Sequence, residues 1–131
     1  MKKLDDTAIL VARVLMPILF VVSGFGKMGG GYAGTQQYMA SMGVPGFLLP
    51  LTILLEFGGG LAILFGFLTR TVALVTVVFV LLTAFIFHSD FSQAANQINF
   101  MKNLSISGGY LLLAVLGAGY FSIDRILNKK W

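Results

Sequence analysis

Four long apolar stretches divide the chain. They cover about residues 7–26, 47–67, 71–87 and 104–121. A helix needs about 20 mostly apolar residues to cross a bilayer, and it satisfies its own backbone hydrogen bonds in lipid. The pattern therefore predicts an all-α, polytopic membrane protein whose residues 1–131 form one domain, a bundle of four transmembrane helices. Only residues 68–70 separate the second stretch from the third, so these two should form a tight antiparallel hairpin.

Two longer connections, at about 27–46 and 88–103, join the predicted spans at one end of the bundle. In the first, Tyr32–Met42 has the spacing of a short helix. In the second, apolar residues between positions 89 and 101 also recur at helical spacing. We expect both segments to lie along the membrane surface or to cap the bundle.

Basic residues outside the spans are distributed unevenly between the two ends of the bundle. One end collects Lys2, Lys3, Arg70, Arg125, Lys129 and Lys130, and the other has Lys27 and Lys102. Cytoplasmic loops of membrane proteins carry an excess of lysine and arginine. The distribution therefore predicts that both termini are cytoplasmic and that the two longer connections face outward.

Composition narrows the class of protein and the cofactors. Hydrophobic residues make up 57% of the chain and charged residues 11%, whereas a soluble domain is about one quarter charged. The sequence has no cysteine and a single histidine, so we expect no disulfide, iron–sulfur cluster, bis-His haem or multi-ligand metal site. The net charge of +4 lies mostly at the chain ends and is an orientation signal rather than a sign of nucleic-acid binding.

Two charged residues interrupt the apolar stretches. Glu56 lies in the middle of the second and Arg13 within the first. Ionisable side chains inside a membrane usually face the bundle interior and pair with one another. Counting 1.5 Å per residue from the outer helix ends places Arg13 about 6 Å from Glu56 in depth and Lys27 about 14 Å, so we expect a Glu56–Arg13 pair. Lys27 and Lys102 are alternative partners, and a protonated Glu56 that relays a proton is the functional alternative.

Residues spaced at multiples of about 3.6 positions share one face of a helix. On the first helix this face holds Arg13, Pro17, Phe20, Gly24 and Lys27, and on the fourth it holds Asn103, Ser107 and Tyr110. We expect both faces to point into the bundle. Snorkelling of the two cations to lipid headgroups is the alternative.

Four polar residues should ring the outward opening of the bundle: Lys27, His88, Lys102 and Asn103. Together with Arg13 and Glu56 they are the candidate ligand-binding or polar-core residues, and the sequence assigns no catalytic residue. A histidine beside a carboxylate can shuttle protons, and Asp90 is close to His88 in sequence. The simpler interpretation of His88 is a cap at the end of its helix.

A ridge of small residues, Gly58, Ala62 and Gly66, repeats every four positions on the second helix. Small residues let another helix approach closely. We expect the ridge to serve packing within the bundle, with a dimer interface as the alternative.

Three ordered motifs carry a resemblance to a known family. They are Arg13 with Ser23–Lys27 (Ser-Gly-Phe-Gly-Lys), Leu54–Leu61 (Leu-Leu-Glu-Phe-Gly-Gly-Gly-Leu) and Phe100–Leu104 (Phe-Met-Lys-Asn-Leu). The chain resembles DoxX-family membrane proteins over nearly its whole length. The resemblance implies a multi-pass protein of the bacterial inner (plasma) membrane. The family's name comes from a membrane subunit associated with a thiosulfate:quinone oxidoreductase. This chain has no thiol and no obvious redox centre, so we expect no catalysis by the chain itself, with a membrane subunit of an oxidoreductase as the enzymatic alternative.

The first functional hypothesis is an accessory or binding protein with a link to redox or stress processes. Its polar-lined intramembrane pocket would hold a quinone or another lipophilic ligand, with Phe20, Phe57 and Tyr110 as candidate walls. The alternatives are an assembly factor that packs on a membrane protein partner or a second copy, and a small proton-coupled transporter. The expected partners are the lipid bilayer, a lipophilic small molecule and a membrane protein or homodimer, and nucleic acid is not expected.

Overall fold

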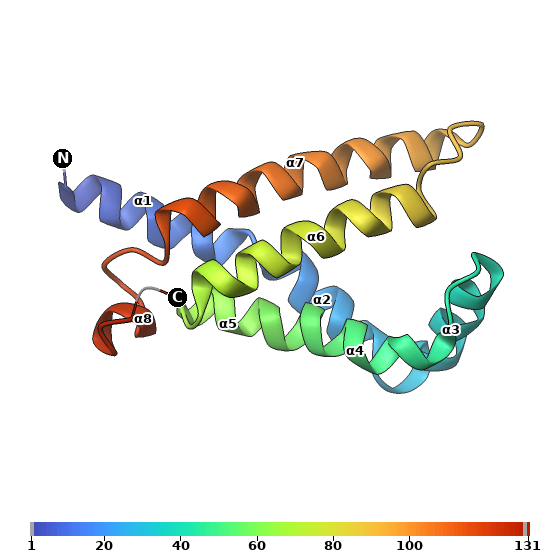
Figure 1. Cartoon of the computed structure of the whole chain (residues 1–131), viewed down its shortest axis with the longest axis horizontal. Helices are drawn as coiled ribbons and strands as arrows, with labels where there is room; N and C mark the ends of the chain where they lie inside the picture. Colours follow the sequence, from blue (N-terminus) through green and yellow to red (C-terminus); the bar gives the residue numbers. More distant parts are fainter. Residues whose placement is uncertain (1, 130) are drawn as a thin grey trace.

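The structure, a computed structural model, describes residues 2–129 and 131. Four long helical rods run side by side, and short helices join them (Figure 1). The first rod is α1 (Lys2–Leu15) and α2 (Ile18–Lys27), and the second is η2 (Gly46–Leu48), α4 (Leu49–Ile53), η3 (Leu54–Gly58) and α5 (Gly59–Phe65). The third is α6 (Thr69–Phe87), and the fourth is α7 (Ala94–Leu116). The linking helices are η1 (Gly29–Gly31), α3 (Tyr32–Ser41) and α8 (Ile123–Ile126).

The described residues contain helices and no strands, which confirms the all-α prediction. Three of the rods, Lys2–Lys27, Gly46–Phe65 and Thr69–Phe87, are long and apolar enough to cross a membrane. The predicted hairpin between the second and third spans is also confirmed, since α5 ends at Phe65 and α6 begins at Thr69. Gly66 turns the chain there in a left-handed conformation (φ 72°), which glycine adopts without steric cost.

The first rod is interrupted at Met16 and Pro17, between α1 and α2. Proline lacks a backbone N–H and its ring clashes with the preceding turn, so it interrupts a helix. The buried residues of the rod are Arg13, Pro17, Phe20 and Gly24, as the predicted face required, and Lys27 is half-buried. The matching face of α7 is also buried at Asn103, Ser107 and Tyr110.

The fourth helix differs from its predicted bounds of about 104–121. It begins ten residues earlier, at Ala94, and ends at Leu116. Residues 94–103 are too polar to register as a membrane span, yet they contain no glycine or proline that would stop a helix. The segment predicted as an outer surface helix is therefore the first part of α7. Gly117, at φ 82°, ends the helix.

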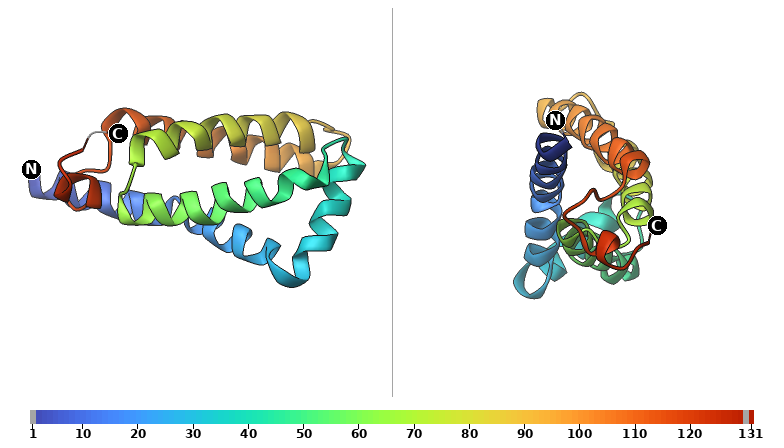
Figure 2. Two further views of the ribbon diagram at one scale, coloured as in Figure 1. Left: turned by 60° about the horizontal axis from the view of Figure 1, so that its bottom comes forward. Right: turned by 90° about the vertical axis from the view of Figure 1, so that its left-hand side faces the viewer.

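The short helix predicted at Tyr32–Met42 is confirmed as α3, which crosses the end of the bundle (Figure 2). Its Met39 is buried, and the ring of Tyr38 stacks on Phe87 of α6 with centroids 5.3 Å apart. The chain termini, α8 and the α5–α6 turn gather at the opposite end (Figure 2).

Two buried charged residues hold that opposite end together. Arg13 donates hydrogen bonds to the carbonyl oxygens of Ile63 (3.0 Å) and Ala118 (2.6 Å), which join the end of α5 to the segment after α7. The Asp124 carboxylate accepts hydrogen bonds from the backbone N–H groups of Leu68 and Thr69, at 2.8 and 3.0 Å. These N–H groups begin α6 and would otherwise be unsatisfied, so Asp124 caps this helix.

The apolar core is narrow, because most large apolar side chains face outward toward lipid. It centres on Phe20, Ile63, Val80, Tyr110 and Leu113. The Tyr110 ring meets Phe20 edge to face at 5.6 Å. Lipid tails are as apolar as leucine, so close packing rather than exclusion of water stabilises such a bundle.

Close packing of the first two rods depends on two glycines. A Cβ atom at Gly24 would lie 2.7 Å from the backbone nitrogen of Phe57, and one at Gly60 would lie 2.7 Å from Cγ2 of Val21. A Cβ at Gly58 would meet only Leu54 of its own rod, at 3.4 Å. Gly58, the first residue of the predicted ridge, therefore does not contact the first rod. Gly66, the last, packs against Ser122 and Arg13.

The glycine contact predicts opposite outcomes for two alanine substitutions in the same pair of rods. Gly24→Ala should lower the free energy of unfolding by about 1–3 kcal/mol, because the added methyl group meets backbone that cannot move aside. Gly58→Ala should be neutral or slightly stabilising, since alanine favours helix and has room. Thermal unfolding in one detergent measures both. Equal effects would contradict this packing.

Candidate functional site

A cavity of about 490 Å³ lies among the rods in the half of the bundle next to α3. Its size is that of a small-molecule site, which typically measures about 300–1,000 Å³. The walls are mostly apolar, with Leu19, Phe20, Leu55, Phe79 and Ile106 among them. The polar residues that reach it are Ser23, Lys27, Thr35, Thr52, Glu56, Thr83, His88, Lys102 and Asn103.

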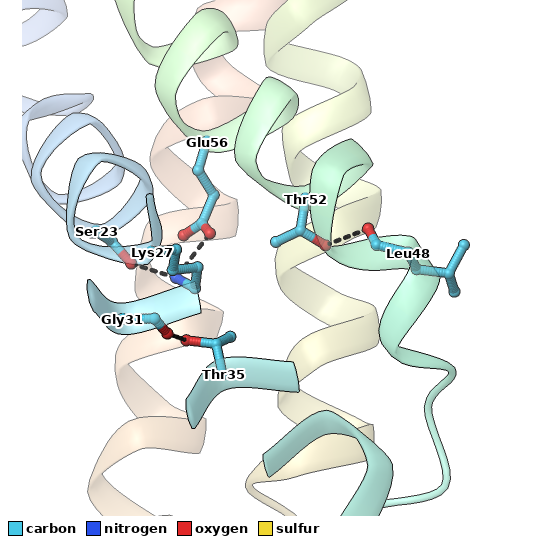
Figure 3. A network of polar contacts seen from close by, with 7 residues as sticks. All are labelled: Ser23, Lys27, Gly31, Thr35, Leu48, Thr52 and Glu56. Carbon is cyan, nitrogen blue, oxygen red and sulfur yellow. Dashed lines mark hydrogen bonds and ion pairs between the residues drawn. The ribbon is translucent and has the colours of Figure 1, made fainter. Parts of the chain in front are cut away.

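The centre of the site is an ion pair between Lys27 and Glu56 (Figure 3). The Nζ atom of Lys27 lies 2.7 Å from Oε1 of Glu56, and it also donates a hydrogen bond of 2.6 Å to the hydroxyl of Ser23. Only 6% of the Glu56 side chain is exposed, against 23% for Lys27. The carboxylate thus lies in the interior and the ammonium nearer the opening.

The predicted Glu56–Arg13 pair is wrong. The depth count assumed that the two helices begin at the same level, but the contact of Gly24 with Phe57 sets their register. Lys27 is then one turn above Glu56, within reach of its flexible side chain. Arg13 lies level with the end of α5, where its guanidinium binds backbone carbonyl groups. Arg13 is a polar-core residue and does not line the cavity.

Glu56 lines the cavity, and its carboxylate is held mainly by Lys27. Its contact with Lys27 is short, but Oε1 is not aligned for a hydrogen bond from any described group. At 2.7 Å the Coulomb attraction remains strong in an apolar setting whatever the angle. Oε1 is therefore buried beside Lys27 and is held by charge rather than by a hydrogen bond.

The backbone around Glu56 is also unusual. Residues Leu54–Gly58 form a π-helical turn within the second rod. Such turns insert an extra residue into a helix and are frequent at functional sites. The turn lies where Gly24 of α2 meets Phe57, and it directs Glu56 into the cavity.

The structure brings the four predicted residues of the opening, Lys27, His88, Lys102 and Asn103, around one cavity. Asn103 is buried and its amide donates to the carbonyl of Val80 (3.3 Å) and the hydroxyl of Thr83 (3.2 Å). Nδ1 of His88 is buried without a hydrogen-bond partner among the described residues.

Asp90 does not partner His88, although it lies close in sequence. Its carboxylate instead accepts hydrogen bonds from the hydroxyl and the backbone N–H of Ser92, at 2.6 and 3.2 Å. These bonds lower the pKa of Asp90 below its ordinary value, because they favour the charged form. A histidine–aspartate proton shuttle therefore has no geometric basis here.

The wall residues predicted from sequence are only partly placed at the cavity. Phe20 lines it, whereas Phe57 packs beside Phe25 (6.2 Å) and Tyr110 is buried behind Phe20. Sequence reasoning missed Ser23, Thr83 and the contribution of α3. Ser23 was detectable, because it precedes Lys27 by four positions and so lies on the same helix face.

Residues of both α4 and α6 line the cavity. α5 packs against α6 near the hairpin turn, and α4 and α6 lie further apart toward α3 (Figure 1). The cavity lining includes Leu51 of α4 and Leu82 of α6, which are 63% and 56% exposed.

Comparison with known proteins identifies the family. The DoxX family model matches residues 8–89. The chain belongs to the DoxX family. This match covers the first three rods together with α3, and it includes Lys27, Glu56 and His88 of the site.

Relatives of known sequence extend the similarity to the whole chain. Inner membrane protein YqjF of Escherichia coli (strain K12) is 71% identical over 131 residues, covering 100% of both chains. Inner membrane protein YphA of the same strain is 40% identical over 124 residues, covering 89% of this chain and 88% of its own. Putative oxidoreductase CatD of Bacillus subtilis (strain 168) is 36% identical over 72 residues, which are 55% of this chain and 53% of its own. No solved structure matches. The predicted location in the inner membrane is confirmed.

The ion pair predicts a strong coupling between two substitutions. Lys27→Met should destabilise the protein by about 3–5 kcal/mol, because it leaves a buried carboxylate without its counter-charge. Adding Glu56→Gln should recover part of this loss, with a coupling free energy of about 1–3 kcal/mol in a double-mutant cycle.

The control cycle joins Glu56→Gln with Arg13→Gln. Both side chains are buried, but they do not touch, so their effects should add to within about 0.5 kcal/mol. Thermal or denaturant unfolding in detergent measures both cycles. Coupling with Arg13 and none with Lys27 would reverse the assignment.

Proposed function

We propose that the protein crosses the membrane four times with both termini in the cytoplasm. Among the described residues, five basic residues outside the spans belong to α1, the start of α6, α8 and the residues after α8, at the end that holds the termini, and two lie at the other end. The excess of lysine and arginine on the cytoplasmic side supports this orientation. α7 supplies the fourth crossing, since it runs alongside α6 over its length.

The cavity that contains the Lys27–Glu56 pair is, we propose, a binding site for a lipophilic ligand with a polar head group. A buried charged pair beside an empty apolar space carries this proposal. Charged side chains within a membrane are costly and mark functional pathways or sites. Apolar walls with a few convergent polar groups are the usual form of a small-molecule site.

The arrangement of the polar groups favours a flat head group with oxygens on two sides, such as a quinone. Lys27 offers an ammonium donor from α2, and Lys102 offers a second one from α7. Phe20, Phe79 and Phe87 supply aromatic walls. The molecule and its apolar tail would enter from the membrane between α4 and α6, since residues of both line the cavity.

A redox connection is part of this proposal. One DoxX relative carries the name putative oxidoreductase, and a quinone, when bound, carries electrons and protons in pairs. The roles of this chain's own side chains are to bind and to orient: Lys27 donates to an oxygen, Glu56 holds Lys27 in place, and the walls exclude water. The protein then serves as an accessory or binding subunit, whose redox partner would be another protein.

Filling the cavity should abolish binding without disturbing the fold. Thr52 lines the cavity and its hydroxyl bonds only to the carbonyl of Leu48 in its own helix (3.2 Å). A short-chain ubiquinone should raise the melting temperature of the protein by about 3 °C or more at saturating concentration. Thr52→Phe should remove most of this rise.

The matched control is Val78→Phe, which adds a ring of the same kind on the lipid-facing side of α6, outside the cavity. This variant should keep the full response to the quinone. Two results would contradict the proposal: no response in the unsubstituted protein, or an equal response in both variants.

The orientation can be tested directly because the chain has no cysteine. Single cysteines replacing exposed Ser92 and exposed Lys3 would report the two ends of the bundle. A membrane-impermeant maleimide should label Ser92→Cys in intact spheroplasts, and should label Lys3→Cys only after the membrane is permeabilised. The opposite pattern would invert the proposed topology.

A further inference from the structure

A second hollow lies at the end of the molecule opposite the cavity. It has a volume of about 210 Å³ and is bordered by the start of α6, the segment after α7, and α8 with the residues that follow it. Three basic residues line it, Arg70, Arg125 and Lys129, together with polar Ser122 and Asn128. None of these residues belongs to the cavity described above.

The three cations have no carboxylate partner within the described part of the chain. Asp124 also lines the hollow, but its Oδ1 accepts from Leu68 N–H and from the indole N–H of Trp131 (2.9 Å), and its Oδ2 accepts from Thr69 N–H. In the described part of the chain, the only ion pair with a nitrogen–oxygen distance of 4.0 Å or less is that of Lys27 with Glu56. Like charges that line one hollow repel each other, and an anion between them removes the repulsion.

The cations are positioned by contacts that leave most of their donors free. The guanidinium carbon of Arg125 lies 3.6 Å from the ring centre of Tyr120. The ring covers one flat face of the guanidinium, and the N–H groups at the guanidinium edge remain available. Lys129 Nζ lies 5.4 Å from the Trp131 ring. Arg70 makes one long hydrogen bond, of 3.5 Å, to the carbonyl of Leu116.

Gly117 makes room for Arg70. Its φ of 82° is unfavourable for other residues, and a Cβ atom there would lie 2.9 Å from Nε of Arg70. The turn after α7 thus has a backbone conformation that favours glycine, and the Arg70 guanidinium packs directly against it at the edge of the hollow.

We propose that this hollow binds a phosphate group. Two guanidinium forks and one ammonium match the geometry of phosphate oxygens, which arginine binds in pairs of hydrogen bonds. The phosphate can come from an anionic lipid headgroup or from a soluble phosphate ester. Leu116, which lines the hollow with the cations, is 61% exposed and would contact the acyl chains of a lipid. Basic pockets between helices on the cytoplasmic side are typical binding sites for lipid phosphates.

The test compares binding of phosphatidylglycerol and phosphatidylcholine to the whole protein in detergent, by native mass spectrometry. The protein should retain phosphatidylglycerol in preference to phosphatidylcholine. Arg70→Gln/Arg125→Gln should weaken retention by about tenfold or more, because it removes both guanidinium forks. Both side chains are exposed, so the melting temperature should change little.

The matched control is Lys2→Gln/Lys3→Gln, which removes the same charge at the same end but outside the hollow. It should retain the lipid normally. A third variant, Lys129→Gln, removes one exposed cation and should give an intermediate loss, which keeps the test decisive if the double arginine variant fails to fold. Equal losses in the lysine control, or equal retention of the two lipids together with no effect of glycerol 3-phosphate, would overturn the proposal.

Addition of glycerol 3-phosphate to the same samples separates the two sources. Displacement of the lipid at low millimolar concentration, absent in the arginine variant, would identify a soluble phosphate ester as the ligand. Retention of the lipid against this competitor would identify the headgroup. Both results support the phosphate site.

Discussion

The approach of the first two rods at Gly24 and Gly60 is the constraint on which the rest of the structure depends. A Cβ atom at either glycine would lie 2.7 Å from an atom of the neighbouring rod, which is closer than Cβ contacts in real proteins. This contact fixes the relative height of the rods, and so it decides which ionisable groups meet. Lys27 is brought above Glu56, and Arg13 is brought to the carbonyl groups that end α5.

The two ends of the bundle use their polar groups in different ways. At the end with the termini, Arg13 and Asp124 satisfy backbone groups of α5 and α6 and of the segment after α7. At the other end, Glu56, His88 and Lys27 surround open space. Hydrogen bonds to buried polar groups stabilise a fold. Polar groups beside a cavity that lack such bonds can bind a ligand, but they lower the stability. Arg13 and Asp124 at the first end therefore stabilise the fold, whereas Lys27 and Glu56 at the second end line a cavity.

Membrane packing explains why so small a chain can hold a cavity. The outward faces of the rods are apolar, and no other part of the protein covers them. In the membrane, lipid covers these faces. Stability then requires tight contact only along parts of the interior, at the glycines, at Phe20–Tyr110 and along α6 and α7. α4 and α6 can therefore stay apart toward α3, and residues of both line the cavity.

The sequence by itself determined the helical class, the three strongest membrane spans, the hairpin at Gly66 and the buried faces that run through Arg13, Phe20 and Gly24 and through Asn103 and Tyr110. Periodicity and hydropathy are local properties, so they can be read without the fold. The start of α7 was missed, because a polar helix outside the bilayer leaves no hydropathy signal. The partner of Glu56 and the location of the cavity were decided only by the tertiary structure. Both depend on the relative height of two helices, which follows from the contact of Gly24 with Phe57, 33 positions away in sequence, and no spacing within either helix records it.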